Sequence, residues 1–145
     1  MNLARYAAES DPVHETYEFW SIGPRGRIKK IVVYEQLASD VYNLSFGDWH
    51  GASGIIQDNT RSNNGDRDKI LATVANTVLD FLEHHPGVRI VAEGITPGKT
   101  RLYQMAINAH FKEITQLFEI KGLTEGLWRS IIQGNNYDAF LLEPK

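Results

Sequence analysis

Two short stretches of the sequence contain residue types that could bind an anion. In the first, residues 94–100 (GITPGKT) place Lys99 and Thr100 after a glycine-containing turn and before a segment with helical spacing, and Arg101 follows directly. The first backbone N–H groups of a helix have no partner within the helix, so they attract phosphate or carboxylate groups. A lysine, a hydroxyl and an arginine beside these N–H groups would add charge and hydrogen bonds. Lys99, Thr100 and Arg101 are therefore candidate ligand-binding residues.

The stretch 94–100 also resembles a phosphate-binding P-loop, in which a glycine-rich turn precedes a lysine and a serine or threonine. Its spacing is one residue short of that motif, and no later predicted strand ends in an aspartate that would hold magnesium. The alternative is that Pro97 and Gly98 only turn the chain and that Lys99 is solvated. Both interpretations place a helix start here.

The second stretch, residues 62–68 (SNNGDRD), leads directly into another predicted helix. A glycine-containing turn at a helix N-terminus can receive pyrophosphate through its amides. Asp66 and Asp68 favour a different role, because carboxylates at this position cap the helix themselves and repel an anion unless Arg67 compensates. The candidate ligand-binding residues of this stretch are Asn63, Asn64, Gly65 and Arg67.

The first half of the chain, which must position the second stretch, has the pattern of a hairpin and a third strand. Residues 17–22 and 27–37 are rich in aromatic and β-branched side chains, and the four-residue connection 23–26 (GPRG) separates them. Residues 41–49 alternate apolar and polar side chains, which is typical of a strand with one buried face. Residues 51–65 are polar and predict a loop.

The second half alternates helices and strands. Apolar side chains recur at helical spacing after Asp66 or Asp68 and again from Leu102 to Ala109, and a short apolar run at residues 88–92 predicts a buried strand between them. The other predicted elements are a short helical turn at 111–117, a strand at 118–121, a helix at 127–133 and a final strand at 137–142.

This order predicts one α+β domain over residues 1–145, with residues 1–14 as a flexible lead or one short helix. The predicted order is β-β-β-α-β-α-β-β with one short extra helix, so that two main helices cover a mixed, mainly antiparallel sheet. The two main helices follow neighbouring strands. We therefore expect their N-termini to open on the same end of the sheet and the segments 62–67 and 99–103 to share a cleft.

The composition limits the classes of function. The chain has 145 residues, of which 42% are hydrophobic and 23% charged, as in ordinary soluble globular proteins. It has no cysteine, which excludes disulfides, thiolate catalysis and zinc sites built on sulfur. The net charge of −3 argues against broad, nonspecific nucleic-acid binding. No signal peptide or membrane span is predicted, so we expect a cytoplasmic protein with no membrane partner.

The histidines show no metal-ligand spacing, so we expect no metal site. Asp48 with His50 could join a distant carboxylate at a metal, but scattered histidines are more often surface residues. The five histidines are His14, His50, His84, His85 and His110.

The predicted hairpin carries a third candidate surface, in which basic side chains lie beside Trp20. Basic and aromatic side chains on a sheet can hold single-stranded nucleic acid by phosphate pairing and base stacking. The alternative is that these charges are the solvated face and edge protection of the hairpin. The aromatic content of the hairpin also suggests a protein partner, which includes a second copy of the chain in a homodimer. The basic residues are Arg25, Arg27, Lys29 and Lys30.

Residues 62–122 are similar in the order of their elements to the GNAT-type N-acetyltransferases. Gly65 matches one glycine of the turn that binds the pyrophosphate of acetyl-CoA in that family, and Leu102 with Tyr103 matches its leucine–tyrosine pair. The resemblance implies acetyl-CoA as a cofactor and Tyr103 as the general acid, with Glu93 as a base that acts through water. The alternative for Tyr103 is a core tyrosine with a satisfied hydroxyl.

The chain also resembles a family of small uncharacterised bacterial proteins of about this length. This resemblance implies a shared fold and no catalytic residues. The stretches that carry it are 19–30 (FWSIGPRGRIKK), 62–74 (SNNGDRDKILATV), 100–105 (TRLYQM) and 136–142 (NYDAFLL).

The sequence thus supports two hypotheses and leaves open whether the protein is an enzyme. The first is a phosphate-ligand-binding or acyltransferase-like protein with a site between residues 62–67 and 99–103. The second is a non-enzymatic interaction module that binds single-stranded nucleic acid or a protein partner through the hairpin at residues 17–34.

Overall fold

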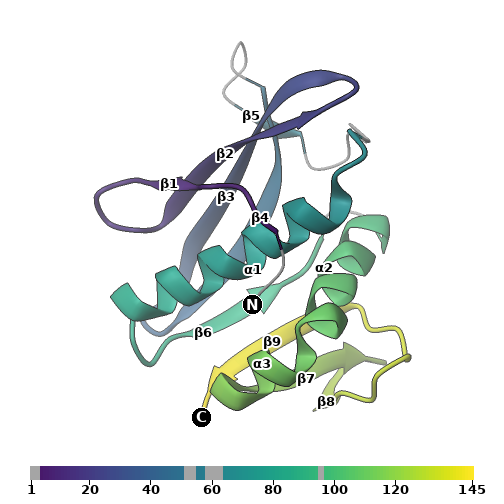
Figure 1. The fold of residues 1–145 in the computed structure, drawn as a ribbon. Helices are drawn as coiled ribbons and strands as arrows, with labels where there is room; N and C mark the ends of the chain where they lie inside the picture. Colours follow the sequence, from purple (N-terminus) through teal and green to yellow (C-terminus); the bar gives the residue numbers. More distant parts are fainter. Residues whose placement is uncertain (1–3, 51–54, 58–63, 95–96) are drawn as a thin grey trace.

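The computed structural model describes residues 4–50, 55–57, 64–94 and 97–145, and they form one mixed sheet with helices on one face (Figure 1). The strand order is β1-β2-β3-β4-β6-β9-β7-β8, and β5 pairs with the far part of β4. The predicted α+β class is confirmed. The strands are β1 Glu9–Ser10, β2 Thr16–Gly23, β3 Gly26–Ala38, β4 Val41–His50, β5 Ile55–Gln57, β6 Arg89–Ala92, β7 Phe118–Thr124, β8 Leu127–Ser130 and β9 Ala139–Pro144, and the helices are α1 Arg67–His84, α2 Pro97–Ala109 and α3 Phe111–Leu117.

The strands β4 and β6 are parallel, in the register Val41 opposite Arg89 to Leu44 opposite Ala92. Every other strand pair among the described residues is antiparallel. The helix α1 makes the crossover between β4 and β6, and α2 follows β6. The predicted loop over residues 51–65 is wrong at β5, so α1 follows β5 in the chain and does not follow β4 directly. Both main helices begin at the same end of the sheet, as expected (Figure 1).

The face of the sheet under the helices forms the core. Alternate side chains of β2, β3 and β4 point to this face, as the period of two predicts. The ring of Phe81 on α1 stacks on Tyr34 at 4.1 Å between centroids and meets Tyr42 edge-on at 5.0 Å. Each large side chain fully buried in this way contributes about 1.5–3 kcal/mol to folding. Core residues on the sheet include Phe19, Val32, Tyr34, Leu44, Phe46, Ile90, Phe140 and Leu142.

No helix covers the opposite face of the sheet in the described part of the chain (Figure 1). Ion pairs between strands lie on this face, with 3.0 Å between Lys29 Nζ and Glu18 Oε2 and 3.0 Å between Lys121 Nζ and Glu143 Oε1. Trp20 on this face leaves 42% of its surface exposed. The alternation of buried and more exposed side chains along β2 thus follows from one face packed under the helices and one face in solvent.

Two turns are tighter than the sequence pattern suggested. Gly23 pairs with Gly26, so only Pro24 and Arg25 connect β2 to β3, and the predicted four-residue connection is wrong. Near the other end of the chain, Glu125 and Gly126 connect β7 to β8 with φ of 53° and 76°. Positive φ at both central residues is the mark of a type I′ hairpin turn.

The prediction of a helix at residues 127–133 is wrong, because residues 127–130 form the second strand of this hairpin, β8. The apolar residues of this segment have helical spacing, but β8 pairs with β7 from Ser130 opposite Lys121 to Leu127 opposite Thr124. The turn before it sends the chain back along β7, and pairing with β7 then overrides the weak helical pattern. The predicted short helix at 111–117 and the strands at 118–121 and 137–142 are confirmed as α3, β7 and β9, with shifted ends for the two strands.

The described part of residues 1–14 also differs from expectation, because it contains the short strand β1 and no helix. Its backbone is attached to the domain, since Tyr6 N donates to Thr73 Oγ1 on α1 over 2.9 Å. Across the described chain, none of the helices has the length and the apolar character that crossing a bilayer requires.

Candidate functional site

The polar cluster, defined as Lys30, Asp48, Lys99 and Thr100, lies where β4 and β6 end and where α2 begins. All four side chains are buried under the helices. Lys30 and Asp48 are opposite each other in the β3–β4 register, and the ammonium group of Lys30 donates to the carboxylate of Asp48. A buried ion pair of this kind is stable only while both charges are present, because each one offsets the desolvation of the other.

Lys99 brings a second ammonium group to the polar cluster. It lies in the first turn of α2, and its Nζ is 3.8 Å from the centroid of the Phe46 ring. This is cation–π geometry, which favours a charged lysine away from bulk water. Phe46 and Asp48 are two residues apart on the same face of β4, so Lys99 and Lys30 contact adjacent inward positions of one strand.

The start of α2 is held against the end of β6 by a close backbone approach. Gly94 N donates to Thr100 Oγ1 over 2.9 Å. A Cβ atom at Gly94 would lie 2.4 Å from Lys99 Cβ and 2.5 Å from Thr100 N, so a side chain does not fit there. Gly94 therefore fixes the position of Lys99, and the Thr100 hydroxyl accepts a bond from the backbone of the turn that precedes α2.

Asn64 connects the β2–β3 turn to the start of α1 by hydrogen bonds, and it is only 2% exposed. Its Oδ1 accepts from Arg25 N over 2.7 Å, and its Nδ2 donates to Gly26 O over 2.9 Å and to Ser21 Oγ over 3.1 Å. Gly23 leaves room for this contact, because a Cβ atom there would be 2.0 Å from Asn64 O. Gly65 follows with φ of 75°, a conformation that glycine adopts without strain.

Asp66 occupies the N-cap position of α1, but its side chain makes no cap hydrogen bond. Its Oδ2 instead accepts from Tyr6 OH and Ser21 Oγ, each over 2.5 Å. Burial and the hydrogen bond to Asp66 raise the pKa of Tyr6. The predicted capping by the Asp66 side chain is therefore wrong, and Asp66 ties the N-terminal segment to β2. Its Oδ1 is buried without a hydrogen-bond partner among the described residues.

The remaining predicted site residues do not join the polar cluster. Arg67 and Arg101 are exposed, and Arg67 Nε lies 3.7 Å from Asp68 Oδ1, which is also exposed. Glu93 is exposed just after β6. Asn63 lies outside the described residues. Of the predicted ligand-binding residues that the structure describes, only Lys99 and Thr100 are therefore in the cluster, and Asn64 and Gly65 lie beside the hairpin.

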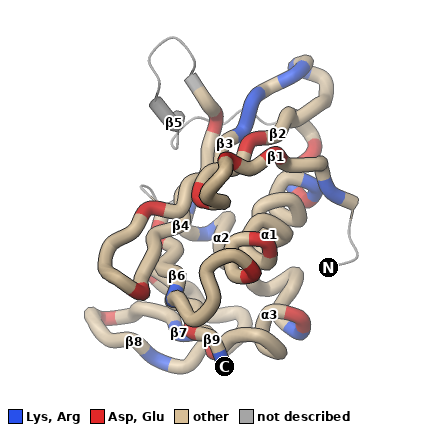
Figure 2. The backbone as a smooth tube through the Cα atoms, turned by 90° about the vertical axis from the view of Figure 1, so that its left-hand side faces the viewer, with Lys and Arg blue, Asp and Glu red and all other residues tan. Residues whose placement is uncertain are grey.

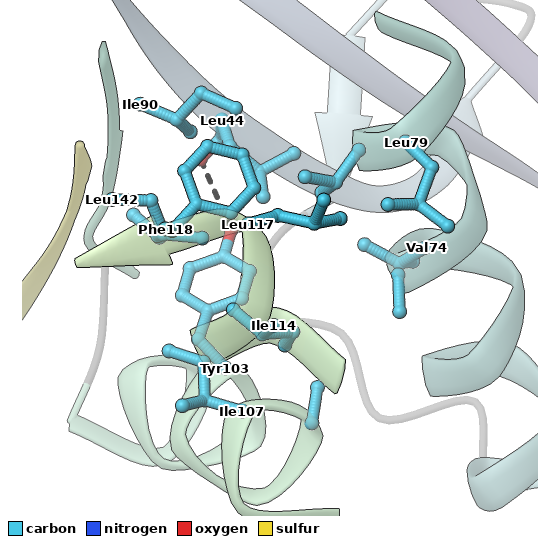
Figure 3. Close-up of a pocket in the computed structure, with 14 residues that line it drawn as sticks. Leu44, Val74, Leu79, Ile90, Tyr103, Ile107, Ile114, Leu117, Phe118 and Leu142 are labelled. Carbon is cyan, nitrogen blue, oxygen red and sulfur yellow. Dashed lines mark hydrogen bonds between the residues drawn. The ribbon is translucent and has the colours of Figure 1, made fainter. Parts of the chain in front are cut away.

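Tyr103, the predicted general acid, is packed in the core. It is 3% exposed, its ring lies 5.3 Å from that of Phe46, and its hydroxyl is 3.5 Å from Leu44 O. It lines an apolar cavity of about 50 Å³ between the three helices and the sheet (Figure 3). The exposed Glu93 and the buried Tyr103 therefore do not have the shared access to solvent that an acid and base pair requires. Other lining residues labelled in Figure 3 include Val74, Ile107, Ile114, Phe118 and Leu142.

A family model described as a family of unknown function (DUF6934) matches residues 2–145. The chain belongs to this family. The resemblance to a family of uncharacterised proteins is thus confirmed at the level of the family. No match was found among curated proteins or among solved structures, and the resemblance to N-acetyltransferases has no support.

In this DUF6934 protein the four basic residues of the hairpin are divided between the two faces of the sheet. Lys30 is buried in the polar cluster, while Lys29 pairs with Glu18 on the open face. The guanidinium of Arg27 lies 4.6 Å from the centroid of the exposed Trp20 ring, and Arg25 is exposed at the turn. Figure 2 shows these basic positions concentrated near the hairpin turn.

Sequence reasoning missed Lys30 and Asp48 as partners, although the signal was present in the strand pattern. Val32, two residues after Lys30 on β3, and Phe46, two residues before Asp48 on β4, are both apolar and buried, so Lys30 and Asp48 occupy inward positions. A charged residue at an inward position of a strand must be paired, because an isolated buried charge is strongly destabilising. A lysine and an aspartate at inward positions of adjacent strands, as here, therefore indicate an ion pair.

We predict that Lys30→Met lowers the free energy of unfolding by about 3–5 kcal/mol, because it leaves Asp48 buried without its cation. The double variant Lys30→Met with Asp48→Leu should recover much of this loss, since it removes both charges. Chemical denaturation of the three proteins measures the effect. If the wild type and Lys30→Met had equal stability, the prediction would be wrong and the Lys30–Asp48 pair would be exposed to water.

Proposed function

We propose that this DUF6934 protein binds a small phosphate-bearing ligand at the end of the sheet where β4 and β6 stop and α1 and α2 start. The observation that carries the proposal is the parallel pairing of β4 and β6, together with the start of α1 and α2 at the end of the sheet where both strands stop (Figure 1). Ligands of α/β proteins bind outside the carboxyl ends of parallel strands, where loops part and helix N-termini converge. The first turns of α1 and α2 and the charged side chains of the polar cluster lie at that end of the sheet.

The charge distribution favours an anion over a cation. Lys30 and Lys99 contribute two ammonium groups around Phe46 and Asp48, and the described part of the cluster has one carboxylate, that of Asp48. The Asp66 carboxylate accepts hydrogen bonds from Tyr6 and Ser21 and leaves the first N–H groups of α1 without a side-chain cap. Helix N-termini attract anions through N–H groups that have no side-chain cap, and a nearby lysine strengthens the attraction.

The described geometry supports ligand binding and does not support acyl transfer. An acyltransferase needs an acid that reaches the leaving thiolate, but the Tyr103 hydroxyl lies in the core beside an apolar cavity. Acetyl-CoA remains a suitable test ligand because it contains a pyrophosphate and a further phosphate group. Its binding would be explained by those phosphates and not by its thioester.

We expect acetyl-CoA, coenzyme A, ATP or inorganic pyrophosphate to bind with a dissociation constant below about 1 mM. Lys99→Met should weaken the binding by about tenfold or more, because it removes one charge while it keeps most of the side-chain volume. Isothermal titration calorimetry measures both affinities. Lys112→Met is the matched control, since Lys112 is exposed on α3, and it should bind like the wild type.

The proposal fails if none of the four compounds binds at about 1 mM. It also fails if Lys99→Met binds as well as Lys112→Met does. Thermal unfolding without ligand checks that both variants are folded.

A second prediction separates binding from catalysis. Tyr103→Phe should leave the affinity for the phosphate compounds within about twofold and lower the free energy of unfolding by at most about 1.5 kcal/mol, because it removes one buried hydroxyl and its hydrogen bond. Calorimetry and chemical denaturation test the two effects. A loss of acetyl-CoA turnover in this variant, with affinity unchanged, would restore the acyltransferase hypothesis.

A second candidate function is contact with single-stranded nucleic acid through Trp20 and Arg27. The observation that favours it is the stacking of the Arg27 guanidinium on the exposed Trp20 ring, which places a cation and a π-face on the open side of the hairpin. Bases stack on such aromatic rings, and phosphates pair with such cations.

For this candidate we expect a salt-sensitive mobility shift with single-stranded DNA that Arg27→Glu abolishes and that the control Lys112→Glu retains. If Arg27→Glu and Lys112→Glu gave equal mobility shifts, the binding of single-stranded DNA would depend on the overall charge of the protein and not on the Trp20–Arg27 surface. The net charge of −3 limits any such binding to this local surface.

A further inference from the structure

His14, which is far from α1 in the sequence, meets Asp80 and His84 at the last turns of α1, outside the polar cluster. His14 Nδ1 lies 2.9 Å from Asp80 Oδ2, and His84 Nδ1 lies 3.7 Å from the same oxygen. The three residues offer ligand atoms that all lie within 4.8 Å of one another. The imidazole rings of His14 and His84 stack with 3.5 Å between their centroids.

Local structure explains why these groups meet. Asp80 and His84 are four residues apart on α1 and therefore share one face of the helix. His14 lies in the turn between β1 and β2 and has φ of 54°, which is rare for a residue other than glycine. Asp11 stabilises this turn, because its Oδ1 accepts from Glu15 N over 2.8 Å and from Thr16 N over 3.1 Å. The turn presents His14 to the helix.

We propose that His14, Asp80 and His84 bind a divalent transition-metal ion of the Zn²⁺ type. Imidazole nitrogen and carboxylate oxygen are ligands that such ions prefer, and three protein ligands leave a fourth position for water. Ligand atoms at about 2.0–2.1 Å from a tetrahedral zinc ion are separated by roughly 3.3 Å. The two separations from Asp80 Oδ2, 2.9 Å and 3.7 Å, lie on either side of that value.

The stacked rings define the movement that binding requires. Their planes differ by only 6°, and a metal ion must lie in the plane of each imidazole that binds it. One ring must therefore rotate. His84 can do so, because it is the last residue of α1 and its side chain is 41% exposed, and the rotation exchanges the 2.9 Å hydrogen bond between His84 Nδ1 and Asp80 O for the metal ion. The ion would then replace the proton that His14 and Asp80 share in their hydrogen bond.

A set of outer contacts already orients the carboxylate. Tyr17 OH donates to Asp80 Oδ2 over 2.6 Å, and Ser10 Oγ lies 3.2 Å from His14 Nδ1. Burial acts to raise the pKa of Asp80, but the hydrogen bonds from Tyr17 and His14 outweigh it and hold that pKa below its ordinary value. Partners of this kind fix metal ligands in place. A bound ion would fasten the β1–β2 turn to α1.

The test is a titration of the metal-free protein with ZnCl₂ by calorimetry and by thermal unfolding, with CoCl₂ as a spectroscopic probe. We expect one Zn²⁺ per chain, a rise of about 5 °C or more in Tm at saturating metal that EDTA reverses, and the visible absorption of four-coordinate Co²⁺. His84→Gln and His14→Gln should each abolish the Tm rise and the Co²⁺ absorption.

The matched control is Glu83→Gln, which removes an exposed carboxylate from the same turn of α1 and should behave like the wild type. The Tm of each variant without metal shows that it is folded, and His84→Gln is expected to be close to the wild type because the side chain is on the surface. The absence of Zn²⁺ binding in the wild type overturns the proposal. Equal binding by the wild type and both histidine variants overturns it as well.

Discussion

The parallel pairing of β4 with β6 is the constraint on which the rest of the structure depends. A parallel pair cannot be closed by a tight turn, so the chain must cross the sheet, and α1 makes that crossing. The antiparallel hairpin β2–β3 extends the sheet on one side of this pair, and β9, β7 and β8 extend it on the other. Because β4 and β6 run in the same direction, α2 starts at the end of the sheet where β4 also stops, and α1 starts at that end as well (Figure 1).

That end of the sheet is also where the helix-covered face changes from apolar to polar. Tyr34, Leu44 and Phe46 fill the middle of the face, whereas Lys30 and Asp48 occupy the equivalent inward positions one step further along their strands. Buried charges are destabilising unless they are paired, so their presence here concentrates strong electrostatic interactions at the helix starts. The geometry and the charge thus single out the same region, which is the one proposed for ligand binding.

The N-terminal segment is fastened to the domain at two separate points. Tyr6 bonds Asp66 at the start of α1, and His14 bonds Asp80 near its end, so the segment follows α1 along much of its length. Both contacts join a side chain of the segment to a carboxylate at or near an end of α1. The polar contacts add to the packing of this segment on the core, where the Tyr6 ring stacks on Phe19 at 5.8 Å between centroids.

How much the sequence predicted varies with the range of the interaction. Periodicity predicted α1, α2, α3 and most strands, because burial of one face imposes a period of two on a strand and 3.6 on a helix. It was wrong at residues 127–133, where a two-residue turn and pairing with β7 decided the conformation. Short-range rules also misjudged the Asp66 side chain, whose partners Tyr6 and Ser21 are 60 and 45 residues away.

The amino-acid sequence by itself therefore determined the class of fold, the neighbouring positions of the two main helices and the candidate role of Lys99, since each depends on local spacing. Only the tertiary structure decided that Lys30 pairs with Asp48, that Tyr103 is enclosed in the core and that His14 meets Asp80 and His84. These contacts join residues 18 to 70 positions apart. Side-chain pairing at such distances depends on strand register and helix docking, and neither has a periodic signature in the chain.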